Sequence, residues 1–219
     1  MSTLLLRLAA PLQSWGDESK FEARKTRREP TKSGIIGILA AALGRKRNES
    51  VEDLCLLRFG VRVDREGKLA YDFHTAKPPK AKDPYITTRY YLEDAVFLVG
   101  LESEDTELLR TLQDALKHPR FPLFLGRRSC PPTLPLVWGG IRSESLIKAL
   151  RSEPPIVSKG KRETVEMRIV CDALGNEQRI ARQQDLPISF SPEHRKYGYR
   201  QVTEFHTQKV EHDPMEELR

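Results

Sequence analysis

Alternating apolar and polar segments divide the first 140 residues into short strands and helices. Residues 3–9 form an apolar run without Gly or Pro inside it, which predicts a buried first strand. Residues 31–44 are apolar almost all round, which predicts a helix packed on several sides. Thr31 or Ser33 can cap the start of that helix, and Gly44 is placed to close it. The chain therefore opens with a strand followed by a buried helix.

The segment from 50 to 125 carries further strands and a second, amphipathic helix. Ser103 can cap that helix, acidic residues suit its positive end, and leucines make one face. A basic, proline-rich stretch at 76–84 has no core residues and predicts a projection. The predicted elements are a helix at 50–57, strands at 59–63 and 69–74 across a Glu66-Gly67 turn, strands at 87–91 and 95–99, a helix at 103–117 and a strand near 121–125.

This order of strand, helix, strands, helix and strand matches a split β-α-β arrangement of the ferredoxin-like kind, which RNA-binding RRM modules share. The stretch at 76–84 is then an insertion between the middle strands. We expect an α+β protein, with one domain over residues 1–140 and a small β-rich extension over 141–219 packed on it. The extension is predicted to hold a short helix near 143–151 and strands at 164–171 and 178–182 around a Gly175-Asn176 turn.

Basic residues outnumber acidic ones, with 37 Lys and Arg against 31 Asp and Glu, for a formal net charge of +6. Such a surplus favours an anionic partner such as nucleic acid. The three cysteines are widely separated and form no paired metal spacing, which suggests a reducing compartment. The start of the sequence lacks the pattern of a signal peptide, and no stretch approaches the roughly 20 apolar residues that span a bilayer. We expect a cytoplasmic protein without a membrane segment.

Basic residues gather in the polar stretch that precedes the helix at 31–44. The start of a helix offers unpaired N–H groups and a partial positive charge, which suit phosphate. The alternative is an ordinary helix cap beside a solvated run of charges. The candidate RNA-binding residues of this stretch are Arg24, Arg27, Arg28, Lys32 and Ser33.

A second basic segment runs from Lys77 to Arg89, where lysines alternate with prolines and two tyrosines follow. A stiff basic projection beside aromatic rings can wedge against a nucleic-acid strand. Arg89 is the candidate contact of this segment. The alternative is a surface hairpin whose tyrosines pack inward, and for Tyr91 we favour that alternative.

A third basic segment combines two phenylalanines with an Arg-Arg pair that lies between a glycine and two prolines. Gly126 permits backbone angles closed to other residues, and the prolines stiffen the exit, so Arg127 and Arg128 are held on a constrained frame. Arginine forks match phosphate oxygens, and aromatic rings offer faces for unpaired bases. Phe121 and Phe124 are the stacking candidates, although strand alternation predicts that one of them belongs to the core. A solvated surface loop is the alternative.

Patterns that would indicate an enzyme are sparse, and we assign no catalytic residue. Lys117 and His118 adjoin at the end of a predicted helix, where they can serve metal-independent RNA cleavage or simply complement the negative helix terminus. Glu204 and His206 share a face of a predicted strand, but no third ligand is evident, so we expect no metal and no cofactor. Trp15 can stack on a base or anchor the loop that holds it.

Four segments, taken in their order and spacing, resemble the CasD family, the small RAMP-type subunit of the type I-E CRISPR surveillance complex Cascade. The region after residue 150 adds little to this resemblance. The four segments are Leu6 to Gly16 (LRLAAPLQSWG), Pro30 to Gly44 (PTKSGIIGILAAALG), Tyr91 to Phe97 (YLEDAVF) and Leu125 to Pro131 (LGRRSCP).

The resemblance implies a ferredoxin-like core with a thumb hairpin, which residues 76–90 fit. It also implies a subunit that caps one end of an antiviral complex and holds the 5′ handle of the CRISPR RNA. Its partners would be the CasC backbone subunit and the large CasA subunit. The RNA contacts of the family carry over onto Arg89, Phe121, Phe124 and the Gly126-Arg127-Arg128 loop.

In the type I-E system, repeat cleavage belongs to the CasE subunit, so the resemblance implies a binder without catalytic activity. A related subfamily in type I-C systems cuts the repeat with a tyrosine, a lysine and a histidine. Lys117 and His118 fall near the place where that lysine and histidine are expected. A metal-independent CRISPR repeat endoribonuclease using these two residues is therefore the alternative function, and a general basic RNA-binding domain without fixed partner subunits is a third.

Overall fold

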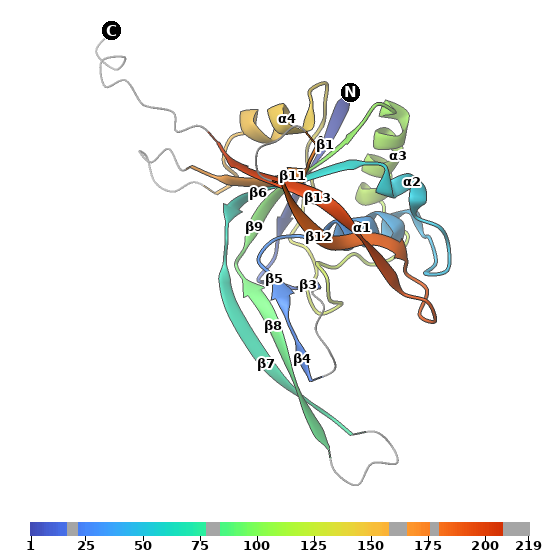
Figure 1. The fold of residues 1–219 in the computed structure, drawn as a ribbon, viewed down its shortest axis with the longest axis vertical. Helices are drawn as coiled ribbons and strands as arrows, with labels where there is room; N and C mark the ends of the chain where they lie inside the picture. The colour runs from blue at the N-terminus through green and yellow to red at the C-terminus, as the bar shows by residue number, and fades with distance from the viewer. Residues whose placement is uncertain (17–21, 78–83, 158–165, 176–179, 208–219) are drawn as a thin grey trace, which may run out of the picture.

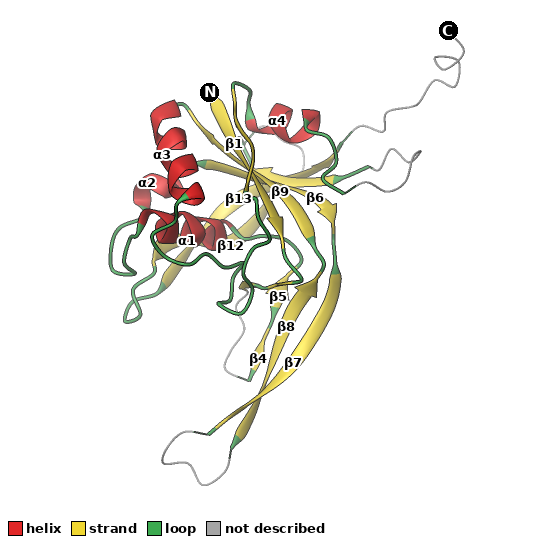
Figure 2. Cartoon of the chain, turned by 180° about the vertical axis from the view of Figure 1, so that it is seen from behind, coloured by secondary structure: helices red, strands yellow, loops and turns green. Residues whose placement is uncertain are grey.

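The computed structural model describes residues 1–16, 22–77, 84–157, 166–175 and 180–207, which form a helix-covered sheet and a hairpin that projects from it (Figure 1, Figure 2). The helices are α1 (Lys32–Leu43), α2 (Glu52–Cys55), α3 (Thr106–Lys117) and α4 (Leu146–Ser152). The strands of the main sheet are β1 (Ser2–Ala9), β6 (Arg58–Arg65), β9 (Val96–Ser103), β10 (Val137–Arg142), β11 (Arg168–Asp172), β12 (Ile180–Ser189) and β13 (Lys196–His206). The other strands are β2 (Leu12–Gln13), β3 (Trp15–Gly16), β4 (Ala23–Arg24), β5 (Thr26–Arg27), β7 (Lys68–Ala76) and β8 (Tyr85–Glu93).

The main sheet of the described residues is antiparallel, in the order β10-β1-β9-β6-β11-β13-β12. Alternation along β1 gives the sheet two apolar faces. Leu4, Leu6 and Leu8 pack with α1 and α3 on one face, whereas Leu5 and Leu98 pack with α4 on the other. The protein is therefore a mixed α/β fold built on antiparallel sheets.

The C-terminal part of the chain extends the same sheet, because β11 pairs with β6. The helix predicted near 143–151 is confirmed as α4. The two strands predicted in this part correspond to β11 and to the start of β12. Their predicted residues 164, 165, 178 and 179, and Asn176 of the turn, lie outside the described residues.

Helix α1 confirms the prediction for residues 31–44 and shows which residues end it. The Thr31 side chain accepts a hydrogen bond from Gly34 N at 3.1 Å, so Thr31 is the N-cap. Gly44 follows the last turn with φ +80°, a conformation that favours glycine. Ile35, Ile36 and Leu39 are fully buried, as an all-round apolar helix requires.

The other helices differ from their predictions in detail. Asp105, not Ser103, caps α3, because the Asp105 carboxylate accepts from Leu108 N at 3.0 Å while Ser103 Oγ accepts from Asp105 N. The helix predicted at 50–57 is reduced to the short α2. None of the helices in the described part of the chain has the length and apolar character that crossing a membrane requires.

Strands β7 and β8 form the long hairpin that projects from the body of the protein in Figure 1. The strands predicted at 69–74 and 87–91 are confirmed, and they pair with each other. Gly67 (φ +75°) lies in the turn between β6 and β7, and β7 pairs with β8 rather than with β6 or any other strand of the main sheet. Residues 78–83 of the predicted projection lie outside the described residues.

Residues 121–125 form no strand, so that prediction is wrong. Leu125 N donates to Cys130 O at 2.7 Å, and Leu125 O accepts from Ser14 N at 3.1 Å. These bonds tie a loop to itself and to the N-terminal segment, and they leave no ladder to a neighbouring strand. The strand that follows α3 in the sheet is β10, which lies later in the sequence.

Candidate nucleic-acid interface

The loop after α3 is fastened to the N-terminal part of the protein. Its start is fixed to α1, because Phe121 N donates to Ala41 O at 3.2 Å. Gly126 has φ +87°, and a Cβ on this residue would lie 1.5 Å from the carbonyl oxygen of Ser14. Only glycine permits two backbone segments to approach so closely. The Arg-Arg pair that follows Gly126 is therefore carried on a fixed turn.

Arg127 reaches from this turn to the N-terminal segment. Its Nη2 donates to Arg24 O at 2.8 Å, and its guanidinium lies 4.5 Å from the centre of the Tyr91 ring. Tyr91 is 5% exposed, which confirms that this ring packs inward. Nη1 of Arg127 is buried and has no hydrogen-bond partner among the described residues. The guanidinium thus rests on an aromatic ring with donor capacity left over.

Arg24 and Arg89 are neighbours on two paired strands. β4 and β8 run parallel, with Arg24 opposite Arg89. Across β7, Arg89 is opposite Asp72, but the Asp72 carboxylate lies 2.9 Å from His74 Nε2. The Nε of Arg89 is buried and finds no partner in the part of the chain that the structure describes. Arg89 therefore lacks the carboxylate that its strand register could offer.

We call Arg24, Arg89 and Arg127 the arginine cluster. β4, β8 and the loop after α3 bring the three together from distant parts of the sequence. No ion pair within the described ranges involves any of them. A guanidinium that faces no carboxylate keeps its charge and its fork of donors available for phosphate.

The other basic candidates lie on two of the three segments that form the cluster, the N-terminal segment and the loop after α3. Arg28 and Arg128 are exposed. Arg27 is half-buried on β5, where it is opposite Trp15 of β3. The contribution of these three arginines to RNA binding stays a prediction.

The aromatic candidates differ in how far their side chains are exposed to solvent. Phe121 is 44% exposed and Phe124 is half-buried, so the prediction that one of them belongs to the core is wrong. Leu125 is fully buried and fills the core from this loop. Trp15 is also fully buried, and its Nε1 donates to Gln13 Oε1 at 3.2 Å. Of the two roles open to Trp15, the structure favours the anchor of the N-terminal loop.

The polar groups at the start of α1 are bound by other residues of the protein. The backbone N–H of Lys32 donates to the Asp185 carboxylate at 2.8 Å, and Thr31 already takes the N–H of Gly34. The Lys32 ammonium is 2.9 Å from Asp172, with the side chain only 7% exposed. Ser33 Oγ lies 3.3 Å from Thr31 Oγ1. Lys32 and Ser33 are therefore occupied by internal contacts, and we leave them out of the proposed interface.

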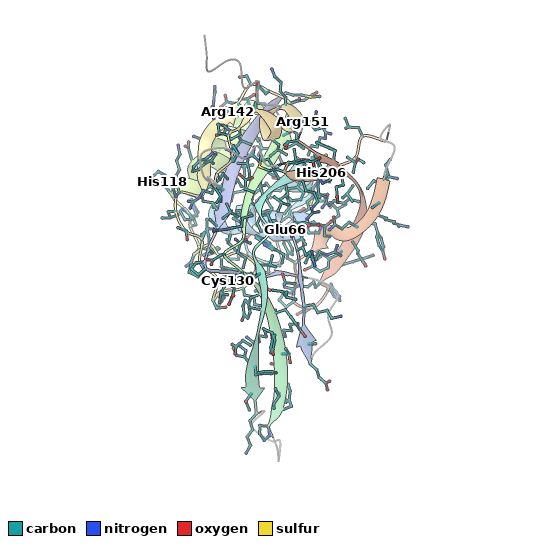
Figure 3. The ribbon with its side chains drawn as sticks, turned by 90° about the vertical axis from the view of Figure 1, so that its left-hand side faces the viewer. Glu66, His118, Cys130, Arg142, Arg151 and His206 are labelled. Atoms are coloured by element: carbon teal, nitrogen blue, oxygen red, sulfur yellow. The ribbon has the colours of Figure 1, made fainter. Side chains whose placement is uncertain are left out.

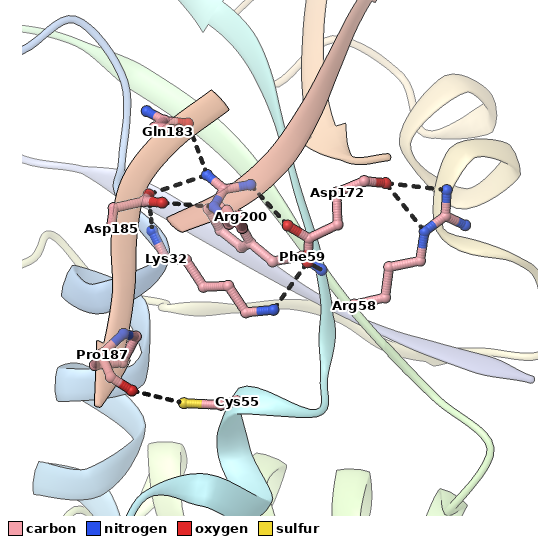
Figure 4. A network of polar contacts seen from close by, with 9 residues as sticks. All are labelled: Lys32, Cys55, Arg58, Phe59, Asp172, Gln183, Asp185, Pro187 and Arg200. Atoms are coloured by element: carbon pink, nitrogen blue, oxygen red, sulfur yellow. Dashed lines mark hydrogen bonds and ion pairs between the residues drawn. The ribbon is translucent and has the colours of Figure 1, made fainter. Parts of the chain in front are cut away.

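Lys32 belongs to what we call the ionic network, together with Asp172, Asp185 and Arg200 (Figure 4). Arg200 Nε is 2.6 Å from Asp185, and Arg200 Nη1 is 2.7 Å from Asp172. Burial lowers the pKa of Arg200, but the hydrogen bonds and negative charges of the two aspartates outweigh burial and raise that pKa above its usual value. Two cations face two carboxylates, so the network is neutral and ties β12 and β13 to α1.

Lys117 and His118, the residues of the alternative cleavage function, are exposed at the end of α3, and His118 lies near the outline of the molecule in Figure 3. The described residues give neither side chain a hydrogen-bond or ion-pair partner that would orient it. Burial raises the pKa of the Cys130 thiol, which makes it a poor nucleophile. The Glu204 carboxylate pairs with Arg168 at 3.3 Å. Among the residues that the structure describes, no cluster of side chains could hold a metal ion.

One surface feature of the hairpin was not predicted from the sequence. Leu69, Tyr71 and Phe73 alternate along β7 and are each between 63% and 65% exposed, on one face of the projecting hairpin. Ile86 lies on the same face of β8 and is 64% exposed. The Tyr71 and Phe73 rings meet edge to face at 5.4 Å. The sequence shows this alternation of apolar and polar residues along β7. A strand whose apolar face is buried has the same pattern, so the sequence alone did not reveal that this face is exposed.

Comparison with known proteins identifies relatives over nearly the whole chain. The family described as "CRISPR-associated protein (Cas_Cas5)" matches residues 3–203. The CRISPR system Cascade subunit CasD of Escherichia coli (strain K12) is 35% identical over 175 residues, which cover 71% of this chain and 78% of CasD.

Two solved structures are similar in fold and in sequence. A chain of a structure titled "CRISPR RNA-guided surveillance complex" has a TM-score of 0.78 and 33% identity, covering 94% of this chain and 90% of its own. A protein titled "Crystal structure of Cas protein" has a TM-score of 0.74 and 42% identity, covering 94% of this chain and 95% of its own. Both likenesses include the body of the fold and most of its length.

Proposed function

The chain belongs to the CRISPR-associated Cas5 family, and on that premise we propose that it is the Cascade subunit that grips the 5′ handle of the CRISPR RNA. In this role it caps one end of the antiviral surveillance complex, beside the CasC backbone subunit and the large CasA subunit. It binds RNA without cutting it. The similarity to CasD and to a chain of an RNA-guided surveillance complex supports the assembly part of the proposal.

The topology supports the interpretation of the body as a ferredoxin-like core. The elements β1, α1, β6, β9, α3 and β10 follow one another in the chain, and their strands stand in the order β10-β1-β9-β6. The β7–β8 hairpin is inserted between the second and third of these strands, where a thumb is expected. Residues 1–140 then form the core with its thumb, and 141–219 form the extension.

The observation that carries the RNA-binding proposal is the arginine cluster. Arg24, Arg89 and Arg127 are assembled from three separate segments, yet no described carboxylate neutralises them. Two of their nitrogens are buried without a partner in the described residues. An assembled set of unneutralised guanidinium groups suits an anionic ligand with several oxygens, and a phosphate backbone is such a ligand.

The residues around the arginine cluster have different roles in RNA recognition. Gly126 holds the turn that carries Arg127, so the phosphate contact is fixed before RNA arrives. Phe121 and Phe124 present ring surface on which unpaired bases can stack. Arg28 and Arg128 are exposed and add attraction that salt weakens. The arginines therefore position the phosphates, and the rings hold the splayed bases.

The first arm of the test measures the affinity of two complexes for the 5′ handle. One complex is wild type, and the other contains the double variant Arg127→Ala/Arg128→Ala. We expect handle affinity to fall about 100-fold, because two charge-assisted contacts are lost. The matched control is Arg110→Ala with Lys148→Ala, which removes two exposed positive charges from α3 and α4 and leaves affinity unchanged. Equal affinity of the two double variants would contradict the proposed grip.

The second arm separates a binder from a ribonuclease. Repeat RNA is incubated in EDTA with the wild-type protein, alone and with its partner subunits, and with His118→Ala. We expect intact RNA in every sample, because nothing in the described residues orients His118. Discrete cleavage by the wild type that His118→Ala abolishes would instead establish the endoribonuclease alternative.

A further inference from the structure

A cavity lies on the face of the sheet that carries α4. It has a volume of about 600 Å³ and lies where β1, β6 and β9 reach the root of the projecting hairpin. This volume falls in the range of small-molecule sites. Its lining includes Arg7, Arg65, Asp94, Thr133, Trp138 and Ile156.

Arg7 points to this face because of strand alternation along β1. Leu6 and Leu8 pack toward α1 and α3, so Arg7 between them points the other way. Its guanidinium carbon lies 5.9 Å from the centre of the Trp138 ring, and its Nη1 donates to Leu134 O at 3.2 Å. Nη1 also donates to Thr133 O at 3.5 Å, so one edge of the guanidinium is fixed, whereas Nε and Nη2 have no hydrogen-bond partner within the described residues.

Arg65 is turned toward the same cavity by a β-bulge. Val63 is opposite Phe97, but Arg65 rather than Asp64 is opposite Val96, so β6 holds one extra residue at this point. Opposed residues of paired strands share a face, and Val96 lines the cavity. Without the bulge, Arg65 would face the α1 side of the sheet. Bulges that re-aim a side chain are typical of binding and catalytic sites.

The charges of the cavity favour an anion. Neither Arg7 nor Arg65 forms an ion pair with any residue in the described ranges, and Arg65 Nε donates only to the backbone oxygen of Asp94 at 2.5 Å. The Asp94 carboxylate is the acidic group in the lining, so two guanidinium groups face one carboxylate. Trp138 supplies a half-buried ring held in place by its Nε1, which donates to Glu153 at 3.0 Å.

We propose that this cavity binds a nucleotide, with its phosphate on Arg65 and Arg7 and its base against the Arg7–Trp138 pair. Guanidinium forks match phosphate oxygens, and guanidinium planes and aromatic rings are the surfaces on which unpaired bases stack. The nucleotide is either free or part of a nucleic-acid strand, since both present the same chemistry. The site is separate from the arginine cluster and does not depend on it.

Tryptophan emission of the full chain tests the proposal, because Trp15 is fully buried and the half-buried Trp138 lines the cavity and is the reporter of the two tryptophans. The probes are adenosine 5′-monophosphate, uridine 5′-monophosphate, a short single-stranded RNA and inorganic phosphate. We expect a saturable change with each nucleotide, and about tenfold weaker binding for Arg65→Ala. Arg65→Lys should recover part of that loss, and the control Arg110→Ala should bind as the wild type does.

Three results would overturn the proposal. These are no saturable change with any nucleotide, equal binding by Arg65→Ala and the wild type, and equal affinity for inorganic phosphate and nucleotides. Tighter binding of the RNA than of the monophosphates supports a strand as the source, and equal binding supports a free nucleotide. Arg127→Ala should leave this signal intact while it weakens handle binding, so failure of either proposal is distinguishable from failure of the other.

Discussion

The ionic network and the arginine cluster are both built from long basic side chains, but they differ in what those side chains face. In the network, each cation lies between 2.6 and 2.9 Å from a carboxylate. In the cluster, Arg127 donates to a backbone carbonyl and rests on a ring, and Arg89 lies opposite an aspartate that is 2.9 Å from a histidine. Within the described residues, one set of charges is neutralised and the other is not.

This difference separates stability from binding. A buried cation whose carboxylate is removed is left desolvated and unpaired, so the network must matter for folding. An unneutralised arginine at the surface of a fixed turn contributes little to folding and can contribute strongly to binding an anion. Replacing residues in each set should therefore affect different measurements.

The largest effect is expected for Arg200→Ala, which removes the cation that contacts both Asp172 and Asp185. The free energy of unfolding should fall by about 3–5 kcal/mol, because two carboxylates lose their main partner in a buried site. Urea denaturation measures the loss. The control is Arg182→Ala, whose guanidinium lies 4.0 Å from the exposed Tyr199 ring and should cost about 1 kcal/mol or less. Equal stability of the two variants would show that the network does not hold the fold.

An intermediate effect is expected for Gly126→Ala, which acts on the frame of the cluster. The added Cβ would collide with Ser14 O, so the turn must move, at a cost of about 2–3 kcal/mol in unfolding free energy. Handle affinity should fall with it, because Arg127 is displaced. Gly175→Ala is the matched control, since Gly175 has nearly the same φ of +89° but no atom within 4 Å of its Cβ. It should cost only the backbone term of about 1 kcal/mol and leave affinity unchanged.

The smallest effect on stability is expected for Arg89→Ala, which removes a cation of the arginine cluster. Unfolding free energy should stay within about 0.5 kcal/mol of the wild type, while handle affinity falls about tenfold. Lys32→Ala should do the reverse, lowering stability and leaving affinity in the assembled complex unchanged. Urea denaturation measures the unfolding free energy of both variants, and RNA titration measures their handle affinity. If both variants lost stability, or both lost handle affinity, the arginine cluster and the ionic network would not differ in function.

The elements with local signals were predictable from the sequence. Helix α1 has a cap at Thr31, an apolar interior and a closing Gly44, and all of these lie within a few residues of one another. The prediction of a strand at 121–125 also rested on a local signal, the spacing of apolar residues, and it was wrong. Leu123 and Leu125 do pack inward, with Leu125 fully buried, but they do so from a loop whose hydrogen bonds run to Ser14 and Cys130.

The site was predictable as a set of residues but not as an arrangement. Each arginine of the cluster lies in a basic segment that the sequence displays, yet their proximity depends on the parallel pairing of β4 with β8. Lys32 was placed in the interface because its local sequence resembles a phosphate site. Its partners, Asp172 and Asp185, are 140 and 153 residues away, so no local pattern could reveal them.

Those long separations have a consequence for the order of events during synthesis. The start of α1 emerges from the ribosome 140 and 153 residues before the two aspartates that neutralise Lys32 and take its N–H. Closing a loop of that length costs entropy that is repaid only when the distant contacts form. Until those aspartates are synthesised, the nascent chain carries an unpaired cation at a site that is buried in the folded protein.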